Sequence, residues 1–142
     1  MSRIEIDKPE KVLFTTEYLI TVSDLNYGNH LGNERVLIMA QECRLRWLRS
    51  MGYSEIDFFG SSLIQVDAGI IYRSEGFHGN SITISLGILN PSSRSFDLVY
   101  TLFNTSTDKV LAEVKTRMVC FNYEIRRPEM LPEKFRETCL EE

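Results

Sequence analysis

A polar turn that runs directly into an apolar helix constrains this chain more than any other feature. Residues 23–33 read Ser-Asp-Leu-Asn-Tyr-Gly-Asn-His-Leu-Gly-Asn and contain one of only two histidines. The residues after this turn predict a helix from Glu34 to about Met51, in which Val36 to Ala40 are all apolar. A helix that is apolar on every side must be enclosed. We therefore expect the rest of the chain to wrap around it.

The start of this helix is a candidate binding site. Asn33 is expected to cap the helix, since its side-chain carbonyl can accept a hydrogen bond from a first-turn N–H. The N–H groups that remain unpaired, and the positive end of the helix dipole, favour a carbonyl or an anion. We expect such a group of a substrate to bind there.

Alternating strand patterns define the fold class. Phe14 to Val22 reads as a strand before the helix, and four more alternating segments follow it, at about 63–74, 82–88, 96–102 and 110–121. Short turns between them imply antiparallel neighbours. One long helix against an antiparallel sheet is an α+β arrangement.

The remaining segments complete this expectation. Residues 54–60 read as a short helix capped by Ser54, and Pro132 to Cys139 as another, while residues 1–12 are polar and expected to be loose at the start. Residues 1–142 are expected to form one domain, because a chain of this length can bury a sizeable core. A sheet covers only one side of a helix, so a second copy of the chain is expected to cover the other.

Composition excludes several classes of function. A net charge of −4 without a basic block argues against nucleic acid as a partner. No apolar run is long enough to insert into a membrane. The three cysteines lack metal-type spacing, and the charged start of the chain is unlike a signal peptide. These features favour a reducing, cytoplasmic setting. No phosphate loop, nucleophile elbow or zinc-type histidine pair occurs, so no metal is expected.

Three motifs point to a known family. Asp24-Leu25-Asn26 with the following Asn29 to Asn33, and the helical Glu42 to Leu48, resemble the hotdog-fold acyl-CoA thioesterases of the 4-hydroxybenzoyl-CoA thioesterase type. Those proteins show Asp-x-Asp-x-x-Gly-His-Val-Asn-Asn and then a helix with Glu-Ala-Arg. Tyr72-Arg73-Ser74-Glu75 with Gly79-Asn80 resembles their Tyr-x-x-Pro-x-x-x-Gly-Asp turn.

The resemblance, which spans about Phe14 to Pro132, implies both a fold and a reaction. A curved antiparallel sheet of about five strands would wrap around the central helix. Chains would pair as homodimers or homotetramers, with active sites at the subunit interface. The reaction would be hydrolysis of an acyl-CoA or acyl-carrier thioester to acid and thiol, without a cofactor other than the CoA of the substrate. N–H groups around Asn29 to Asn33 would hold the oxyanion.

The chain also departs from the family pattern. The second Asp of the motif, often the nucleophile or base, is Asn26, and an amide neither takes a proton at neutral pH nor attacks well. Three hypotheses follow: a thioesterase for fatty or aromatic acyl groups, a non-catalytic acyl-CoA-binding protein, and a hydratase or dehydratase that leaves the thioester intact.

Four side chains are candidates for catalysis, each with a structural alternative. Glu42 is the leading base, unless it only pairs with Arg46 four residues on. His30 orients substrate or relays a proton, or stabilises the turn. Asn26 donates to the carbonyl or positions water, or forms an Asx-turn. Asp24 takes part in the chemistry, or only in the turn.

The other candidates are assigned to substrate binding. Residues 27–29 are expected to shape the pocket mouth. Arg73 and Ser74 are assigned to the pantetheine or phosphates of CoA by family analogy, or Arg73 is simply an exposed strand residue. Asp67 would approach a neighbouring site, or simply face solvent. The full binding set is Tyr27, Gly28, Asn29, Asn33, Asp67, Arg73 and Ser74.

Overall fold

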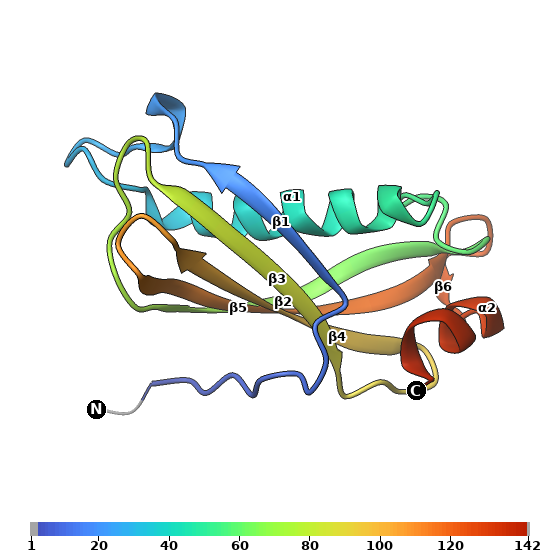
Figure 1. The fold of residues 1–142 in the computed structure, drawn as a ribbon. Helices are drawn as coiled ribbons and strands as arrows, with labels where there is room; N and C mark the ends of the chain where they lie inside the picture. The colour runs from blue at the N-terminus through green and yellow to red at the C-terminus, as the bar shows by residue number, and fades with distance from the viewer. Residues whose placement is uncertain (1–2, 142) are drawn as a thin grey trace.

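A computed structural model describes residues 3–141; residues 1, 2 and 142 of the expected domain lie outside this range. The elements in chain order are β1 (Phe14–Leu19), a 3-10 turn (Val22–Asp24), α1 (Asn33–Ser50), β2 (Ser62–Tyr72), β3 (Ser81–Leu89), β4 (Ser95–Asn104), β5 (Lys109–Asn122), β6 (Arg127–Pro128), α2 (Glu133–Phe135) and a π-helical turn (Arg136–Leu140). Figure 1 shows their arrangement, with α1 lying across the sheet. The α+β arrangement expected from the sequence is confirmed.

The sheet is antiparallel throughout, in the order β1-β3-β4-β5-β2, with the two-residue β6 beside β5. Strand β2 is therefore an edge strand of this chain. Its register shifts between Gln65 and Asp67, so the strict alternation read from the sequence does not continue through the strand.

One side of α1 packs on the sheet and the other is open. The packed side consists of Val36, Met39, Ala40, Cys43, Trp47 and Leu48. On the open side, Ile38 is 42% exposed and Leu45 is 39% exposed. The sheet of a single chain therefore covers one side of α1, as expected, and the covering of the other side by a second copy stays a prediction.

The start of α1 also differs from the expectation. Asn33 is the first helical residue, and Gly32 holds the cap position without a side-chain hydrogen bond. The N–H of Arg35 bonds to the carbonyl of Gly32 at 3.0 Å. Asn33 is thus one residue too late in the chain to cap the helix.

Residues 54–60 form a turn and not the expected helix. Ser54 does accept a hydrogen bond from the N–H of Asp57. However, Phe59 and Gly60 adopt positive φ values of 53° and 89°, and Phe58 and Ser61 exchange backbone hydrogen bonds. The left-handed pair reverses the chain into β2 before a helix can propagate.

An extended segment, residues 3–12, crosses the face of the sheet opposite α1; we call it the N-terminal strap (Figure 1). Ile71 and Val99 are buried but do not belong to the core beneath α1. A Cβ atom on Gly87 would lie 2.5 Å from the carbonyl oxygen of Lys11, so only glycine allows the strap this close. The strap is therefore packed against the sheet, while residues 1 and 2, at the start that was expected to be loose, lie outside the described residues.

No helix within residues 3–141 combines the length and the apolar composition that a membrane-spanning helix requires.

Candidate active site

A hollow of about 270 Å³ lies at the N-terminal end of α1; we call it the helix-start pocket. The polar turn, the first turn of α1, the end of β2 with the loop after it, and β5 all contribute to it. It is lined by His30, Leu31, Asn33, Val36, Tyr72, Arg73, Ser74, Glu75, Gly76 and Leu111.

Contacts between segments distant in sequence hold the walls of this pocket together. The hydroxyl of Tyr72 donates to the backbone carbonyl of Asn33 at 3.0 Å. The N–H of Leu31 donates to the carbonyl of Gly76 at 2.8 Å. A Cβ atom on Gly76 would lie 2.8 Å from Cδ1 of Ile20, so glycine allows the loop to pack this closely against β1 and the turn.

The first turn of α1 offers hydrogen-bond donors to this pocket. The N–H groups of Asn33 and Glu34 have no acceptor among residues 3–141. The N–H groups of Asn29, Leu31 and Gly32 instead bond to the carbonyls of Asn26, Gly76 and Asp24. Within the expected range Asn29 to Asn33, the N–H groups without an acceptor among residues 3–141 are therefore those of His30 and Asn33, and Glu34 adds another directly after them.

Asp24 is fully buried and serves the framework of the turn. Its carboxylate accepts hydrogen bonds from Tyr18, from Thr21 and from the guanidinium of Arg35 at 3.0 Å. Burial by itself would raise the pKa of Asp24, but these hydrogen bonds outweigh burial and hold the pKa below its usual value. The carboxylate of Asp24 therefore stays ionised and hydrogen-bonded within the turn. Asp24 does not line the pocket.

The tip of the polar turn points away from the pocket. The side-chain oxygen of Asn26 accepts a hydrogen bond from the N–H of Gly28 at 2.9 Å, which is an Asx-turn. Asn29 adopts a positive φ of 64°, and Tyr27 is fully exposed. In this chain Asn26 to Asn29 shape the turn, and the residues of the turn that line the pocket are His30, Leu31 and Asn33.

The structure does not bring Glu42 to the helix-start pocket. Its carboxylate accepts a hydrogen bond from Arg46 at 2.8 Å, and Arg46 also donates to Thr16 and to the carbonyl of Glu17. This contact directs Glu42 toward β1. Glu42 also follows Asn33 by nine residues, which at the helical rise is about 13 Å along the axis.

Three of the predicted binding residues lie on β2 or directly after it: Arg73 and Ser74 line the pocket, and Asp67 does not. Arg73 donates to Glu113 at 3.1 Å and Ser74 donates to the carbonyl of Val110 at 2.7 Å, and both line the pocket. Asp67 pairs with Lys115 at 2.9 Å, away from the pocket. Four predicted residues thus gather in one place: His30, Asn33, Arg73 and Ser74.

Tyr72 and Glu75 were not assigned from the sequence but line the same pocket. Glu75 forms no ion pair or side-chain hydrogen bond with any residue in the range 3–141. The only signal for either residue was the motif Tyr72-Arg73-Ser74-Glu75, in which Glu75 stands where the family has proline.

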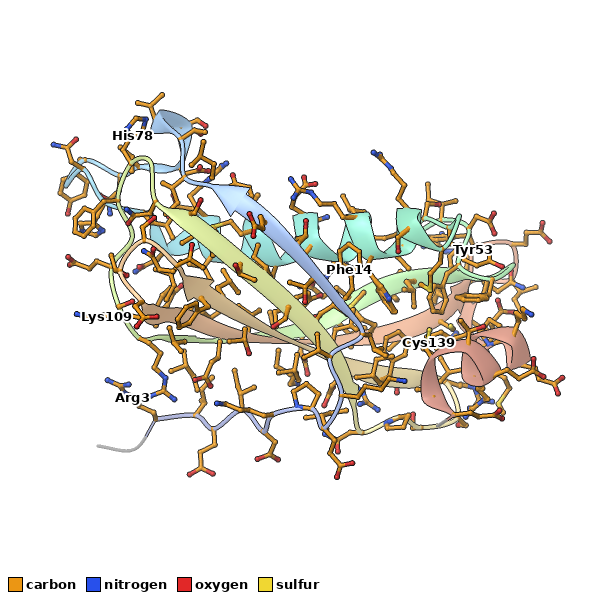
Figure 2. The ribbon with its side chains drawn as sticks, viewed as in Figure 1. Arg3, Phe14, Tyr53, His78, Lys109 and Cys139 are labelled. Carbon is orange, nitrogen blue, oxygen red and sulfur yellow. The ribbon has the colours of Figure 1, made fainter. Side chains whose placement is uncertain are left out.

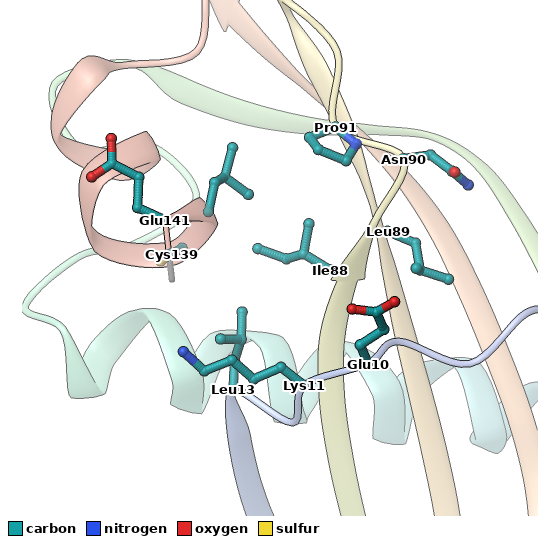
Figure 3. Close-up of a pocket in the computed structure, with 10 residues that line it drawn as sticks. Glu10, Lys11, Leu13, Ile88, Leu89, Asn90, Pro91, Cys139 and Glu141 are labelled. Atoms are coloured by element: carbon teal, nitrogen blue, oxygen red, sulfur yellow. The ribbon is translucent and has the colours of Figure 1, made fainter.

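A separate hollow of about 240 Å³ lies between the strap and the C-terminal turn (Figure 3). Leu13, Ile88 and Leu140 line it, with Lys11 and Glu141 among the other residues around it. None of the predicted site residues contributes to this hollow. Within residues 3–141, no three His, Cys, Asp or Glu side chains gather as metal ligands would.

Comparison with solved structures shows the hotdog fold. The 1,4-dihydroxy-2-naphthoyl-CoA thioesterase Slr0204 from Synechocystis superposes with a TM-score of 0.78 at 23% identity, covering 87% of this chain and 92% of that one. SAV2348 from Staphylococcus aureus, solved in complex with CoA, gives 0.78 at 19% identity, covering 94% and 84%. The PA2801 protein from Pseudomonas aeruginosa gives 0.81 at 16% identity, covering 89% and 98%.

Residues 20–138 match the model of the thioesterase-like superfamily, and this chain belongs to that family. A search of curated protein sequences finds no significant match.

Proposed function

We propose that this protein hydrolyses acyl-CoA thioesters to a free acid and CoA at the helix-start pocket. The observation that carries the proposal is the composition of that pocket in a thioesterase-like chain. Asn33, whose N–H is unpaired, lines the pocket together with His30 and the carboxylate-bearing Glu75, and Glu34 with its own unpaired N–H directly follows Asn33. Thioester hydrolysis needs both kinds of group, a donor pair for the developing oxyanion and a base for water.

The proposed mechanism begins with the thioester carbonyl oxygen bound by the N–H groups of Asn33 and Glu34. Glu75 takes a proton from water as the water oxygen attacks the carbonyl carbon. The negative charge that develops on the oxygen is stabilised by the two N–H groups and by the helix dipole. The C–S bond then breaks, and the proton from Glu75 passes to the leaving sulfur, directly or through His30.

Glu75 is preferred as base because the other candidates are engaged. The Asp24 carboxylate already accepts hydrogen bonds from three side chains. Asn26 carries an amide in place of an acid. Glu42 is the competing assignment, which requires its Arg46 contact to open and the thioester to lie on the β1 side of the helix.

The acyl group is assigned to the apolar part of the same pocket, where Leu31, Val36 and Leu111 provide the walls. These residues suit a fatty or aromatic acyl group equally. CoA is the proposed thiol, supported by two proteins of the same fold, one a naphthoyl-CoA thioesterase and one solved with CoA.

A homodimer, or a homotetramer built from two such dimers, is part of the proposal. Edge strand β2 exposes its backbone and Val66, which is 55% exposed, and α1 exposes Ile38 and Leu45 on its open side. A second copy paired along β2 would cover these groups and bring its own residues near the helix-start pocket. The unpaired thiols of Cys43, Cys120 and Cys139 suit a reducing compartment, and we propose the cytoplasm.

A non-catalytic acyl-CoA-binding protein is the second candidate. This function is favoured by the amide of Asn26, which stands in place of an acid. It is also favoured by Asp24, whose carboxylate is already hydrogen-bonded, so the motif has no carboxylate left to act as a base. Release of CoA thiol from a panel of short, long and aromatic acyl-CoAs separates the two functions. Sustained release from at least one substrate supports the hydrolase. Intact acyl-CoA bound at micromolar concentration without turnover over hours supports the binding protein.

A further inference from the structure

Three hollows follow one another around the end of β2. The helix-start pocket includes Tyr72 and Arg73. A second hollow of about 340 Å³ shares Tyr72 and extends to Ile71 and to Arg3 of the N-terminal strap. A third, of about 490 Å³, shares Arg73 and lies between the strap and Ile71; we call it the outer hollow. The three hollows are therefore neighbours that extend from the start of α1 to the strap side of the sheet.

Figure 2 shows Arg3 on the strap, at the end of the molecule where α1 begins. Ile71 is buried on the strap side, and a Cβ atom on Gly69 would lie 3.3 Å from Cδ1 of Ile4. The strap is therefore fixed against the sheet at this end, and Arg3 is held near Arg73 by packing.

The outer hollow combines three kinds of side chain. Arg3 and Arg73 provide guanidinium groups, Ile4, Ile6 and Ile71 provide apolar surface, and Glu5 and Asp7 provide carboxylates. Arg73 uses its Nε for Glu113, so its two terminal nitrogens remain available, and its side chain is 42% exposed.

We propose that the N-terminal strap is part of the substrate site and that the outer hollow binds the 3′-phospho-ADP end of CoA. The pantetheine arm then passes Tyr72 into the helix-start pocket. This inference rests on the proposed function and assigns its thiol carrier as free CoA.

The chemistry of the ligand matches that of the hollow. Guanidinium groups bind phosphate oxygens in bidentate fashion, and carboxylates accept hydrogen bonds from ribose hydroxyls and from the adenine amino group. Isoleucine side chains offer an apolar surface to the adenine ring. An acyl group on a carrier protein brings the pantetheine arm but no adenine nucleotide. The side chains of the outer hollow would then have no ligand to bind.

The test uses three substrates with one acyl group: the CoA thioester, the 3′-dephospho-CoA thioester and the pantetheine thioester. Arg3→Gln should raise KM for acyl-CoA roughly fivefold to tenfold, the effect of losing one exposed charge-assisted contact, with kcat unchanged. The effect should shrink for the dephospho substrate and vanish for acyl-pantetheine. Lys8→Gln is the matched control, because Lys8 lies on the same strap but lines none of the three hollows.

Equal kinetics of Arg3→Gln and the wild type with acyl-CoA would overturn the inference. So would an equal loss with acyl-pantetheine, which is the signature of a strap that only supports the fold. A carrier-protein thioester hydrolysed with a higher kcat/KM than acyl-CoA would also overturn it.

Calorimetric titration with CoA itself separates this inference from the proposed hydrolysis. CoA binding that weakens in Arg3→Gln but not in Lys8→Gln supports the nucleotide site even if no acyl-CoA is turned over, in which case only the hydrolysis fails. If acyl-CoA is turned over but the affinity for CoA is unchanged in Arg3→Gln, the proposed nucleotide site is contradicted. The proposed hydrolysis is then still supported.

Discussion

The hydroxyl of Tyr72 and the backbone carbonyl of Asn33 are joined by a hydrogen bond of 3.0 Å, which fastens the last residue of β2 to the first residue of α1. Burial, and then the nearby carboxylate of Glu34, raise the pKa of Tyr72, so its hydroxyl keeps its proton and remains a donor. The hydrogen bond therefore fixes the position of the proposed oxyanion donors at the start of α1 relative to the end of β2.

Tyr72→Phe removes this bond and leaves the ring in place. We expect a loss of about 0.5–1 kcal/mol in the free energy of unfolding, since the bond is partly exposed. We also expect kcat/KM for acyl-CoA to fall several-fold, because the start of α1 is no longer fixed to β2. Urea denaturation and steady-state kinetics measure the two effects. Tyr123→Phe is the control, since Tyr123 is exposed on the β5–β6 turn. Equal behaviour of the two variants would contradict this role of Tyr72.

Asp24 should contribute stability that depends on pH. Its folded pKa lies below the usual value of 3.8, so its contribution is complete above about pH 3.8 and is lost as the pH falls through the folded pKa. Asp24→Asn should lower the free energy of unfolding by roughly 1–3 kcal/mol at neutral pH, and the difference from wild type should shrink below pH 3.8. Denaturation at a series of pH values tests this. A difference that stays constant down to acid pH would contradict the assignment.

Arg44 and Arg46 lie two residues apart on α1 and should differ strongly in their effect on stability. Arg44 is buried and donates to Glu55, Gln65 and Tyr100 at 3.0, 3.2 and 3.0 Å. Arg44→Met leaves these groups without their cation and should cost about 3–5 kcal/mol. Arg46 pairs with Glu42 near the surface, and Arg46→Met should cost at most about 1 kcal/mol. Similar losses in both variants would show that the buried contacts of Arg44 are not maintained in solution.

The cysteine thiols should play no part in catalysis. Burial raises the pKa of Cys43 to about 12 and the pKa values of Cys120 and Cys139 to about 11. All three therefore remain protonated thiols at neutral pH and react poorly with electrophiles. Iodoacetamide should leave hydrolysis unchanged and should alkylate the thiols rapidly only in denaturant. Rapid inactivation of the folded protein would contradict this prediction.

The sequence predicted most of the helices and strands but only part of the candidate site. Strands β3 and β5 alternate over most of their length, and the long apolar helix leaves few arrangements open. Residues 54–60 carried the Ser54 and Asp57 signal of a helix start, but a turn satisfies the same hydrogen bond. The N-terminal strap was missed because its contacts with Gly69 and Gly87 are long-range and leave no local periodicity.

The candidate site was only partly predictable for a similar reason. The positive φ of Asn29 decides which residues of the polar turn face outward, and the bond between Leu31 and Gly76 decides which loop closes the pocket. Neither feature is visible in spacing along the chain. Glu75 was therefore not predicted as a site residue, although it lines the pocket. Glu42 was predicted from its motif, but in this chain it pairs with Arg46.

The kcat values of Glu75→Gln and Glu42→Gln with the best acyl-CoA decide whether Glu75 is the base. Both changes replace a carboxylate with an isosteric amide, so folding should be preserved in each. We expect Glu75→Gln to lower kcat about 100-fold or more, the usual contribution of a general base, and Glu42→Gln to stay within about threefold of wild type. Full kcat in Glu75→Gln, with or without a loss in Glu42→Gln, would contradict a reaction driven from the helix-start pocket by Glu75.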